Sequence, residues 1–341
     1  MSFNFTRRLM EKNSNTNSFL TLLAKEEVIP EKVKQNLLHF YENYKNAVGL
    51  NKSSDEIFTR FLLLVKEQME HPFSFEPYHE QIRAPFDYYA FGLDMLRPLV
   101  DIEKSSLRGE DNLKQITAYL SQGDNVVLLS NHQTEADPQA ISILLEKNYN
   151  KLAAEMIFVA GERVITDPVA VPFSMGRNLI CIYSKRYIDH PPEQKLKKQL
   201  HNKHTMELMS KLLIEGGKCI YVAPSGGRDR RNEQGVIEVA PFDPQSIEMF
   251  YLMAKKAKTK THFFTLALKT YDLLPPPVTI QVELGETRHT QRAGIHLSFG
   301  KEINMQHFPG DDALDKHVRR ENRSTFIWQQ VKRGYTNNVV A

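Results

Sequence analysis

The sequence VVLLSNHQTEADP, residues 126–138, decides the fold. Its first four residues are apolar without alternation and begin with two β-branched valines, which predicts a strand buried on both faces. The polar residues that follow include His132 and, five positions later, Asp137. Five positions turn a helix by about 140°, so one helix cannot bring these two side chains together. We therefore expect a turn at the end of a buried strand, with a histidine beside an acid.

Pro138 predicts where the next helix begins. Proline disfavours helical geometry at the residue before it and suits the first helical position, so we expect a helix over 138–146 with Asp137 as its N-cap. Two interpretations of the pair stay open. In the commoner one, Asp137 only caps the helix and His132 is a surface turn residue. In the other, the carboxylate orients a neutral imidazole that acts as a general base.

Short apolar runs alternate with longer helical patterns from about residue 83, which predicts an α/β fold with a mixed, largely parallel sheet flanked by helices. The expected helices cover 138–146, 193–215, 243–256 and a terminal segment after 311. Because the last strands follow one another without helices, we expect the sheet to be mixed at one edge. The expected strands cover 126–130, 156–160, 179–183, 219–223, 263–268, 279–284 and 295–299.

Apolar residues recur at helical intervals between positions 19 and 70, which predicts a small N-terminal helical domain ahead of the sheet. The stretch 71–79 is rich in proline and aromatic residues and has no period, so it is interpreted as a connection. We expect a helical domain with its linker over 1–82 and an α/β domain over 83–341.

Composition excludes several classes of function. The 44 basic and 41 acidic residues leave a net charge of +3, which predicts no nucleic-acid partner. No apolar run reaches the roughly 18 residues that span a bilayer, so no integral membrane segment is expected, while peripheral membrane contact stays open. His201, His204 and Glu207 share one expected helix with several lysines, which would repel a cation. We expect no metal site and no cofactor.

Two expected strands end in basic residues. The strand at 179–183 leads to Lys185 and Arg186, and the strand at 219–223 leads to Arg228 and Arg230. The carboxyl ends of parallel strands line the ligand crevice of an open α/β sheet, so these cations can converge on the His132 turn and bind a phosphate. Gly226 and Gly227 lie between the second of these strands and Arg228, and they would let the backbone approach a ligand closely. Ser225 is expected in the same pocket. Each feature is also common as an ordinary turn or a solvated charge.

The segment 161–177 is a long irregular stretch whose apolar residues either wall a pocket or simply pack. The two cysteines, Cys181 and Cys219, lie inside apolar runs, which fits reduced and packed thiols.

With these segments laid out, the chain resembles the soluble plastid-type glycerol-3-phosphate acyltransferases, within the glycerolipid acyltransferase superfamily marked by His-x4-Asp. The resemblance covers most of residues 83–300, and the N-terminal helical region also looks like that family's small helical domain. It rests on SNHQTEADP at 130–138, TDP at 166–168, PFSMGRNLICIYSK at 172–185, APSGGRDR at 223–230, APFD at 240–243 and LPPP at 274–277.

The resemblance implies transfer of a fatty acyl chain from acyl carrier protein, or from acyl-CoA, to the sn-1 hydroxyl of glycerol 3-phosphate. The product would be 1-acyl-glycerol 3-phosphate, and the reaction would be the first step of phospholipid synthesis. The resemblance also implies that His132 is the general base, that the acceptor hydroxyl attacks the donor directly, and that Asp137 orients His132. Four cations become the phosphate ligands: Arg228, Arg230, Lys185 and Arg186. The family's strand-end pair is lysine then histidine, where this chain has Arg186 and Tyr187.

Acyl carrier protein is strongly acidic as a class, so a basic surface is expected to receive it. Two lysine groups are candidates, and both are also explained as ordinary solvated faces. They are Lys195, Lys197 and Lys198, and Lys255, Lys256, Lys258 and Lys260.

Three alternatives remain at this stage: a hydrolase that uses metal-bound water, a non-catalytic lipid or carrier-protein binding module, and an acyltransferase that takes lysophosphatidate as its acceptor. For the compartment, the start of the chain favours a bacterial cytoplasm, with the plastid stroma as the alternative.

Overall fold

The computed structural model describes residues 18–49, 52–184, 188–277 and 287–339. These residues contain one large sheet whose strands are ordered β1-β5-β4-β6-β3-β9-β10-β2, and a small hairpin-like pair of β7 (Arg230–Arg231) and β8 (Ile237–Glu238). The large sheet is formed by β1 (Tyr78–His79), β2 (Ser106–Arg108), β3 (Asn125–Ser130), β4 (Ile157–Gly161), β5 (Asn178–Ile182), β6 (Cys219–Val222), β9 (Thr261–Lys269) and β10 (His296–Glu302).

The predicted α/β class is confirmed. The five central strands run parallel, since β4 pairs in parallel with β5 and β6, and β3 with β6 and β9. The sheet is mixed at both edges and not at one, because the short strand β1 pairs antiparallel with β5 while β10 pairs antiparallel with β9. The strand expected over 279–284 lies outside the described residues.

Strand β3 lies inside the sheet and is buried on both faces, as its apolar run predicts. Val126 and Leu128 belong to one hydrophobic core, whereas Val127 and Leu129 belong to the other, because successive side chains of a strand point to opposite faces. Every residue of β3 is buried. The carboxyl end of this strand, where the His132 turn begins, is therefore held by packing against hydrophobic cores on both faces of the sheet.

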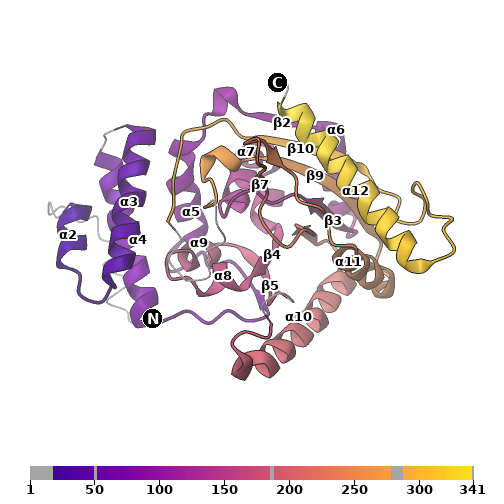
Figure 1. Cartoon of the computed structure of the whole chain (residues 1–341), viewed down its shortest axis with the longest axis horizontal. Coiled ribbons are helices and arrows are strands. Elements are labelled where there is room, and N and C mark those ends of the chain that lie inside the picture. Colours follow the sequence, from indigo (N-terminus) through magenta and orange to yellow (C-terminus); the bar gives the residue numbers. More distant parts are fainter. Residues whose placement is uncertain (1–17, 50–51, 185–187, 278–286, 340–341) are drawn as a thin grey trace.

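Helices cover the two faces of the sheet (Figure 1). The second core is closed by α10 (Lys195–Glu215), α11 (Pro244–Ala257) and α12 (Lys316–Val339). The first core is closed by α5 (Tyr88–Leu96), α6 (Glu110–Ser121) and α7 (Asp137–Glu155). Helix α7 begins at Asp137, one residue before the start that Pro138 predicts, and it extends well beyond residue 146.

The N-terminal helices are α2 (Phe19–Lys25), α3 (Glu31–Val48) and α4 (Lys52–Glu70). They lie side by side at one end of the molecule (Figure 1) and share the first core. The ring of Phe61 on α4 lies 6.2 Å from that of Phe91 and 5.3 Å from that of Phe173. The helical region is thus packed directly on the α/β part, and a boundary between residues 82 and 83 stays a prediction.

The segment 161–177 is more regular than expected. It contains two short helices, α8 (Glu162–Thr166) and α9 (Val171–Ser174). Cys181 and Cys219 are buried free thiols, as predicted, and burial raises the pKa of each thiol to about 12. Among the described helices, none is both long and apolar enough to cross a bilayer.

Candidate active site

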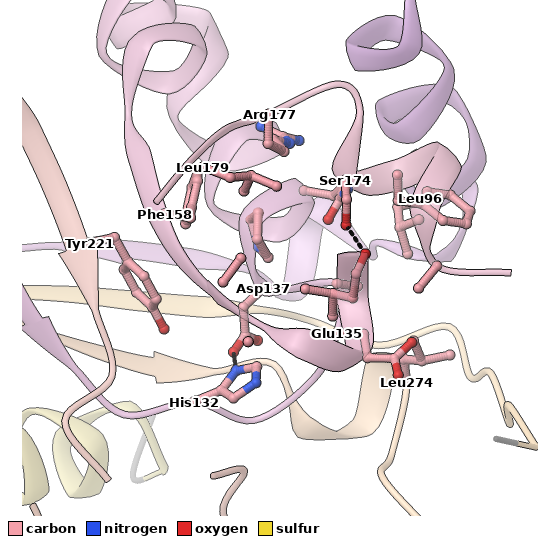
Figure 2. Close-up of a pocket in the computed structure, with 18 of the residues that line it drawn as sticks. Leu96, His132, Glu135, Asp137, Phe158, Ser174, Arg177, Leu179, Tyr221 and Leu274 are labelled. Carbon is pink, nitrogen blue, oxygen red and sulfur yellow. Dashed lines mark hydrogen bonds and ion pairs between the residues drawn. The ribbon is translucent and has the colours of Figure 1, made fainter. Parts of the chain in front are cut away.

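The turn after β3 brings His132 and Asp137 together. Nδ1 of His132 lies 2.8 Å from Oδ2 of Asp137 (Figure 2). The Asp137 side chain is 1% exposed and the His132 side chain 31%, so the acid is inside the protein and the imidazole reaches toward solvent. This is the turn that the five-residue spacing requires.

Asp137 does not cap α7, so this detail of the prediction is wrong. Helix α7 has no side-chain cap, because the turn folds back and the carboxylate meets amides that precede the helix. Oδ2 of Asp137 accepts the main-chain N–H of Gln133 at 2.8 Å, and Oδ1 accepts that of Thr134 at 3.3 Å. The hydroxyl of Thr270, just after β9, donates to Oδ1 at 2.6 Å. The acid is held by donors on all sides.

These contacts fix the proton on the imidazole. A carboxylate only accepts hydrogen bonds, so Nδ1 of His132 must carry the hydrogen that it shares with Asp137. In the neutral ring, Nε2 is then unprotonated. His132 also lines a pocket, so an unprotonated nitrogen is available there to take a proton from a bound hydroxyl.

Asn131 and Gln133, on either side of His132, tie the turn to β9. Asn131 donates from Nδ2 to the carbonyl of Leu268 at 2.9 Å and accepts the N–H of Leu268 at 2.8 Å. Oε1 of Gln133 accepts the N–H groups of Thr270 and Tyr271 at 2.7 and 3.0 Å. Sequence reasoning missed both residues, since no local pattern announces contacts with partners 137 or 138 positions away.

Asp229, which sequence reasoning also missed, joins the same network from the segment after β6. Its main-chain N–H donates to the carbonyl of His132 at 2.6 Å. Oδ2 accepts the side-chain amides of Asn131 at 2.8 Å and Gln133 at 3.1 Å, and Oδ1 accepts the N–H of Ala240 at 2.9 Å. Burial raises the pKa of Asp229 to about 6, although these hydrogen bonds act in the opposite direction.

The two arginines of the predicted phosphate site flank this buried acid. They are the residues directly before and after Asp229 in the chain. Nη1 of Arg228 lies 3.8 Å from Oε1 of Glu135, a residue of the His132 turn, and Nη1 of Arg230 donates to the carbonyl of Pro277. Arg228 and His132 are therefore on the same side of the sheet.

Glu135 also binds a second arginine that the sequence did not indicate. Oε2 of Glu135 accepts Nε and Nη2 of Arg288 at 3.1 and 2.9 Å, and Nη2 lies 3.3 Å from Oδ2 of Asp167. The side chain of Arg288 is only 6% exposed. Positions 135 and 288 are 153 residues apart, and neither belongs to a strand-end basic pattern. The buried cation lies between two acids at the edge of the His132 pocket.

The remaining predicted site residues fall into two groups. Ser225, Gly226 and Gly227 form a tight turn after β6, in which Gly226 has a φ of +64° and the Ser225 hydroxyl donates to the carbonyl of Gly227 at 2.9 Å. The left-handed φ explains a glycine at position 226. Lys185, Arg186 and Tyr187 lie outside the described residues.

A pocket extends inward from His132 over the first face of the sheet. About 1050 Å³ is free of protein atoms there, open solvent at the mouth included. Residues at the carboxyl ends of β4 and β6 line it, and so do residues of the segment 161–177. Its walls are mainly apolar, with contributions from Met95, Leu96, Phe158, Val164, Ala170, Phe173 and Leu179 (Figure 2). Such a pocket suits a long apolar ligand whose reactive end lies at the imidazole.

Of the lysines proposed as a docking surface, Lys198 is not on a solvated face. Its side chain is 3% exposed, and its ammonium donates to Glu162 at 3.0 Å and to the carbonyl of His190 at 2.7 Å. Lys195 and Lys197 are exposed, and so are all four members of the second group.

Residues 105–280, about half of the chain, match the Acyltransferase family. The chain is 41% identical over 296 residues to a chloroplastic glycerol-3-phosphate acyltransferase of Cucurbita moschata, covering 85% of this chain and 66% of that protein. It is 39% identical over 318 residues to the chloroplastic glycerol-3-phosphate acyltransferase of Arabidopsis thaliana, covering 90% and 68%. For the corresponding protein of Spinacia oleracea, identity is 40% over 276 residues, covering 79% and 58%.

The expectation of a bacterial cytoplasm is wrong. The relatives named above are chloroplastic plant enzymes, and they point to a plastid. That expectation rested on the first residues of the chain alone, whereas the matches to these relatives extend over most of it.

Proposed function

This chain belongs to the acyltransferase family and, within it, to the glycerol-3-phosphate acyltransferases, and on that premise we propose that it transfers an acyl chain to the sn-1 hydroxyl of glycerol 3-phosphate. The observation that carries the proposal is the imidazole of His132, oriented by the buried Asp137, at the open end of an apolar pocket and on the same side of the sheet as Arg228. The product is 1-acyl-glycerol 3-phosphate.

His132 acts as the general base in this mechanism. Its Nε2 takes the proton from the sn-1 hydroxyl while the oxygen attacks the thioester carbonyl carbon of the donor. A new ester C–O bond forms, the C–S bond breaks, and the imidazolium returns the proton to the departing thiolate. Asp137 stabilises the imidazolium and holds the ring in one tautomer. No acyl-enzyme intermediate is required.

The acceptor's phosphate is bound by cations beside His132. Arg228 and Arg230 are proposed as its ligands, and Lys185 and Arg186 as further ones on the sequence resemblance alone. A guanidinium offers a planar fork of donors that matches phosphate oxygens. Ser225, Gly226 and Gly227 form the neighbouring turn, where a backbone with a left-handed glycine can approach the acceptor closely.

Glu135 gives this site an internal counterion. Its carboxylate lies 3.8 Å from Arg228 while it also binds Arg288. A phosphate dianion that approaches Arg228 would compete with Glu135 for the guanidinium. The acceptor is then favoured because it can offer two charges, whereas unphosphorylated glycerol offers none.

Acyl carrier protein is proposed as the main donor, with acyl-CoA as the alternative. The apolar pocket suits the acyl chain of either, because its thioester would sit at His132. The exposed lysines of α10 and those around the end of α11 offer positive charge to an acidic carrier. The kcat/KM for the carrier-linked donor should then fall as the salt concentration rises. A kcat/KM that does not depend on salt would remove these lysines from the proposal.

A single assay tests the function. The protein is incubated with a radiolabelled acyl donor, with and without glycerol 3-phosphate, and the products are separated. Acceptor-dependent formation of 1-acyl-glycerol 3-phosphate is expected. Acceptor-independent release of fatty acid would indicate a hydrolase, and no product would indicate a binding module. Lysophosphatidate in place of glycerol 3-phosphate checks the alternative acceptor.

A further inference from the structure

A buried arginine closes the inner end of the pocket. Arg177 precedes β5, at the end of the sheet opposite to the carboxyl edge that carries His132. Figure 2 shows His132 and Arg177 at opposite ends of the lined space, with Phe158 and Leu179 between them. Arg177 is 3% exposed, whereas the His132 side chain is 31% exposed, so the lined space is closed to solvent at the arginine and accessible at the histidine.

The hydrogen-bonding capacity of Arg177 is only partly used. Nη1 donates to the hydroxyl of Ser142 at 2.6 Å, and Ser142 is on α7. Within the described part of the chain, Nε and Nη2 have no hydrogen-bond partner although both atoms are buried. Buried donors without acceptors are rare, because each one has lost its water. Such a group at the end of a pocket points to a ligand or water that approaches it from the pocket.

The charge of Arg177 is also unusual for its position. Its guanidinium carbon lies 4.6 Å from the centre of the Tyr89 ring, and no carboxylate of the described residues acts on it. Burial accordingly lowers the pKa of Arg177 to about 10. A buried arginine is normally paired with an acid. Here the Tyr89 side chain and the Ser142 hydroxyl replace that acid, while the positive charge of Arg83 lowers the pKa of Arg177 further.

Gln139 adds a second polar group to the same end. It is 3% exposed, lines the pocket, and its Oε1 has no partner among the described residues. Gln139 and Ser142 are three positions apart on α7, so their side chains share one face of the helix. Since Ser142 binds Arg177, these three side chains form a polar cluster under an otherwise apolar wall.

We propose that Arg177, with Gln139, forms a polar floor that sets the longest acyl chain the enzyme accepts, which makes Arg177 a specificity-determining residue. The inference rests on the proposed function. Along the apolar walls, each further buried methylene improves binding by about fourfold. A chain that reaches the floor gains nothing more, because its methyl end cannot bond the guanidinium and would displace the water that can.

The test compares two arginines that contact the same ring. Arg177→Met removes the charge and donors while it keeps a long, adaptable side chain. Arg83→Met is the matched control, since the Arg83 guanidinium carbon lies 4.4 Å from the centre of the Tyr89 ring but the side chain is 44% exposed and does not line the pocket. For each variant, kcat/KM is measured with even-numbered saturated donors from decanoyl to eicosanoyl.

In R177M, the preferred chain is expected to become longer by two or more carbons. The ratio of kcat/KM for the first donor beyond the wild-type optimum to that for the optimum should rise by about 15-fold, because two more methylenes are buried. R83M should keep the wild-type profile. A folded R177M with the wild-type profile, or with an equal loss for every chain length, would overturn the proposal.

Two further measurements keep the proposal testable. If R177M does not fold, Gln139→Met serves in its place and should shift the profile in the same direction; an unchanged profile in folded Q139M then overturns the proposal. Binding of free saturated fatty acids, measured by displacement of a fluorescent fatty acid, needs no turnover. If the wild-type protein transfers no acyl chain, the proposed function fails. Binding of longer fatty acids that is tighter in R177M than in wild type would still support the proposed role of Arg177.

Discussion

The main-chain N–H of Asp229 donates to the carbonyl of His132 at 2.6 Å, which ties the segment that carries the two arginines directly to the turn that carries the imidazole. The Asp229 carboxylate strengthens this link through Asn131 and Gln133, the two neighbours of His132. A shift of the arginine segment would therefore move the imidazole as well. In the proposed mechanism this link sets the distance between the acceptor's phosphate and the base.

His132→Ala should abolish most turnover. A general base contributes about 10²–10⁴-fold to the rate, so kcat should fall by at least that range while the protein stays folded. Asp137→Asn should also lower kcat, since an amide can donate to Nδ1 and thereby favour the wrong tautomer. Steady-state kinetics and thermal unfolding of both variants provide the measurement. Near-normal kcat in folded H132A would exclude the proposed role.

Arg228→Ala should weaken acceptor binding. Loss of a charge-assisted hydrogen bond to phosphate costs about 1.5–3 kcal/mol, so the KM for glycerol 3-phosphate should rise by about 10- to 150-fold with a smaller change in kcat. Arg231→Ala is the control, because Arg231 is a half-exposed neighbour that lies 3.6 Å from Asp272 and should leave the KM unchanged. Equal KM values for R228A and wild type would contradict the phosphate assignment.

Arg288→Met should destabilise the protein strongly. It would leave the buried Asp167 and Glu135, whose side chain is 13% exposed, without their shared cation, and breaking a largely buried pair in this way costs about 3–5 kcal/mol. Arg292→Met is the control, since Arg292 is 56% exposed and lies 4.0 Å from Asp101. A surface pair of this kind is worth less than about 1 kcal/mol. Urea unfolding of the two variants should separate them clearly.

Asp229 should give the free energy of unfolding a specific pH dependence. Its pKa is about 6 in the folded protein against 3.8 for the ordinary side chain, so the folded state binds the proton more tightly. Asp229 therefore contributes about 3 kcal/mol to the free energy of unfolding below about pH 4, and this contribution is lost as the pH rises through 6. Urea unfolding from pH 4 to 7 measures it. The difference in stability between wild type and Asp229→Asn should shrink as the pH rises, and a constant difference would contradict the assignment.

Much of the fold could be predicted because its signals are local. The apolar run of β3 predicts a strand buried on both faces, and Pro138 predicts the start of α7 to within one residue. Helix α5 was missed because seven of its residues, from Tyr88 to Leu96, are buried, and a helix buried nearly all round has no polar face to reveal its period. Helix α6 was missed for the opposite reason, since only Leu113 and Ile116 are buried in it.

The candidate site was only partly predictable. His132 and Asp137 lie close together in sequence, and a turn between them was required by spacing. Thr270 donates to Asp137 across 133 positions, and the Arg288–Glu135 pair spans more, so no local pattern could indicate either. The expected N-cap failed because the turn directs the carboxylate toward amides before the helix, which depends on three-dimensional folding of residues 133–136.

The bonds from Asn131 and Gln133 to the main chain of β9 mean that the imidazole is already oriented before any ligand arrives. Amide protons of Leu268 and Thr270, which point into these side chains, should consequently exchange with deuterium only when the whole domain opens. The reactive turn then belongs to the slowest-exchanging unit of the protein, and any adjustment to substrates of different size has to come from the walls of the pocket.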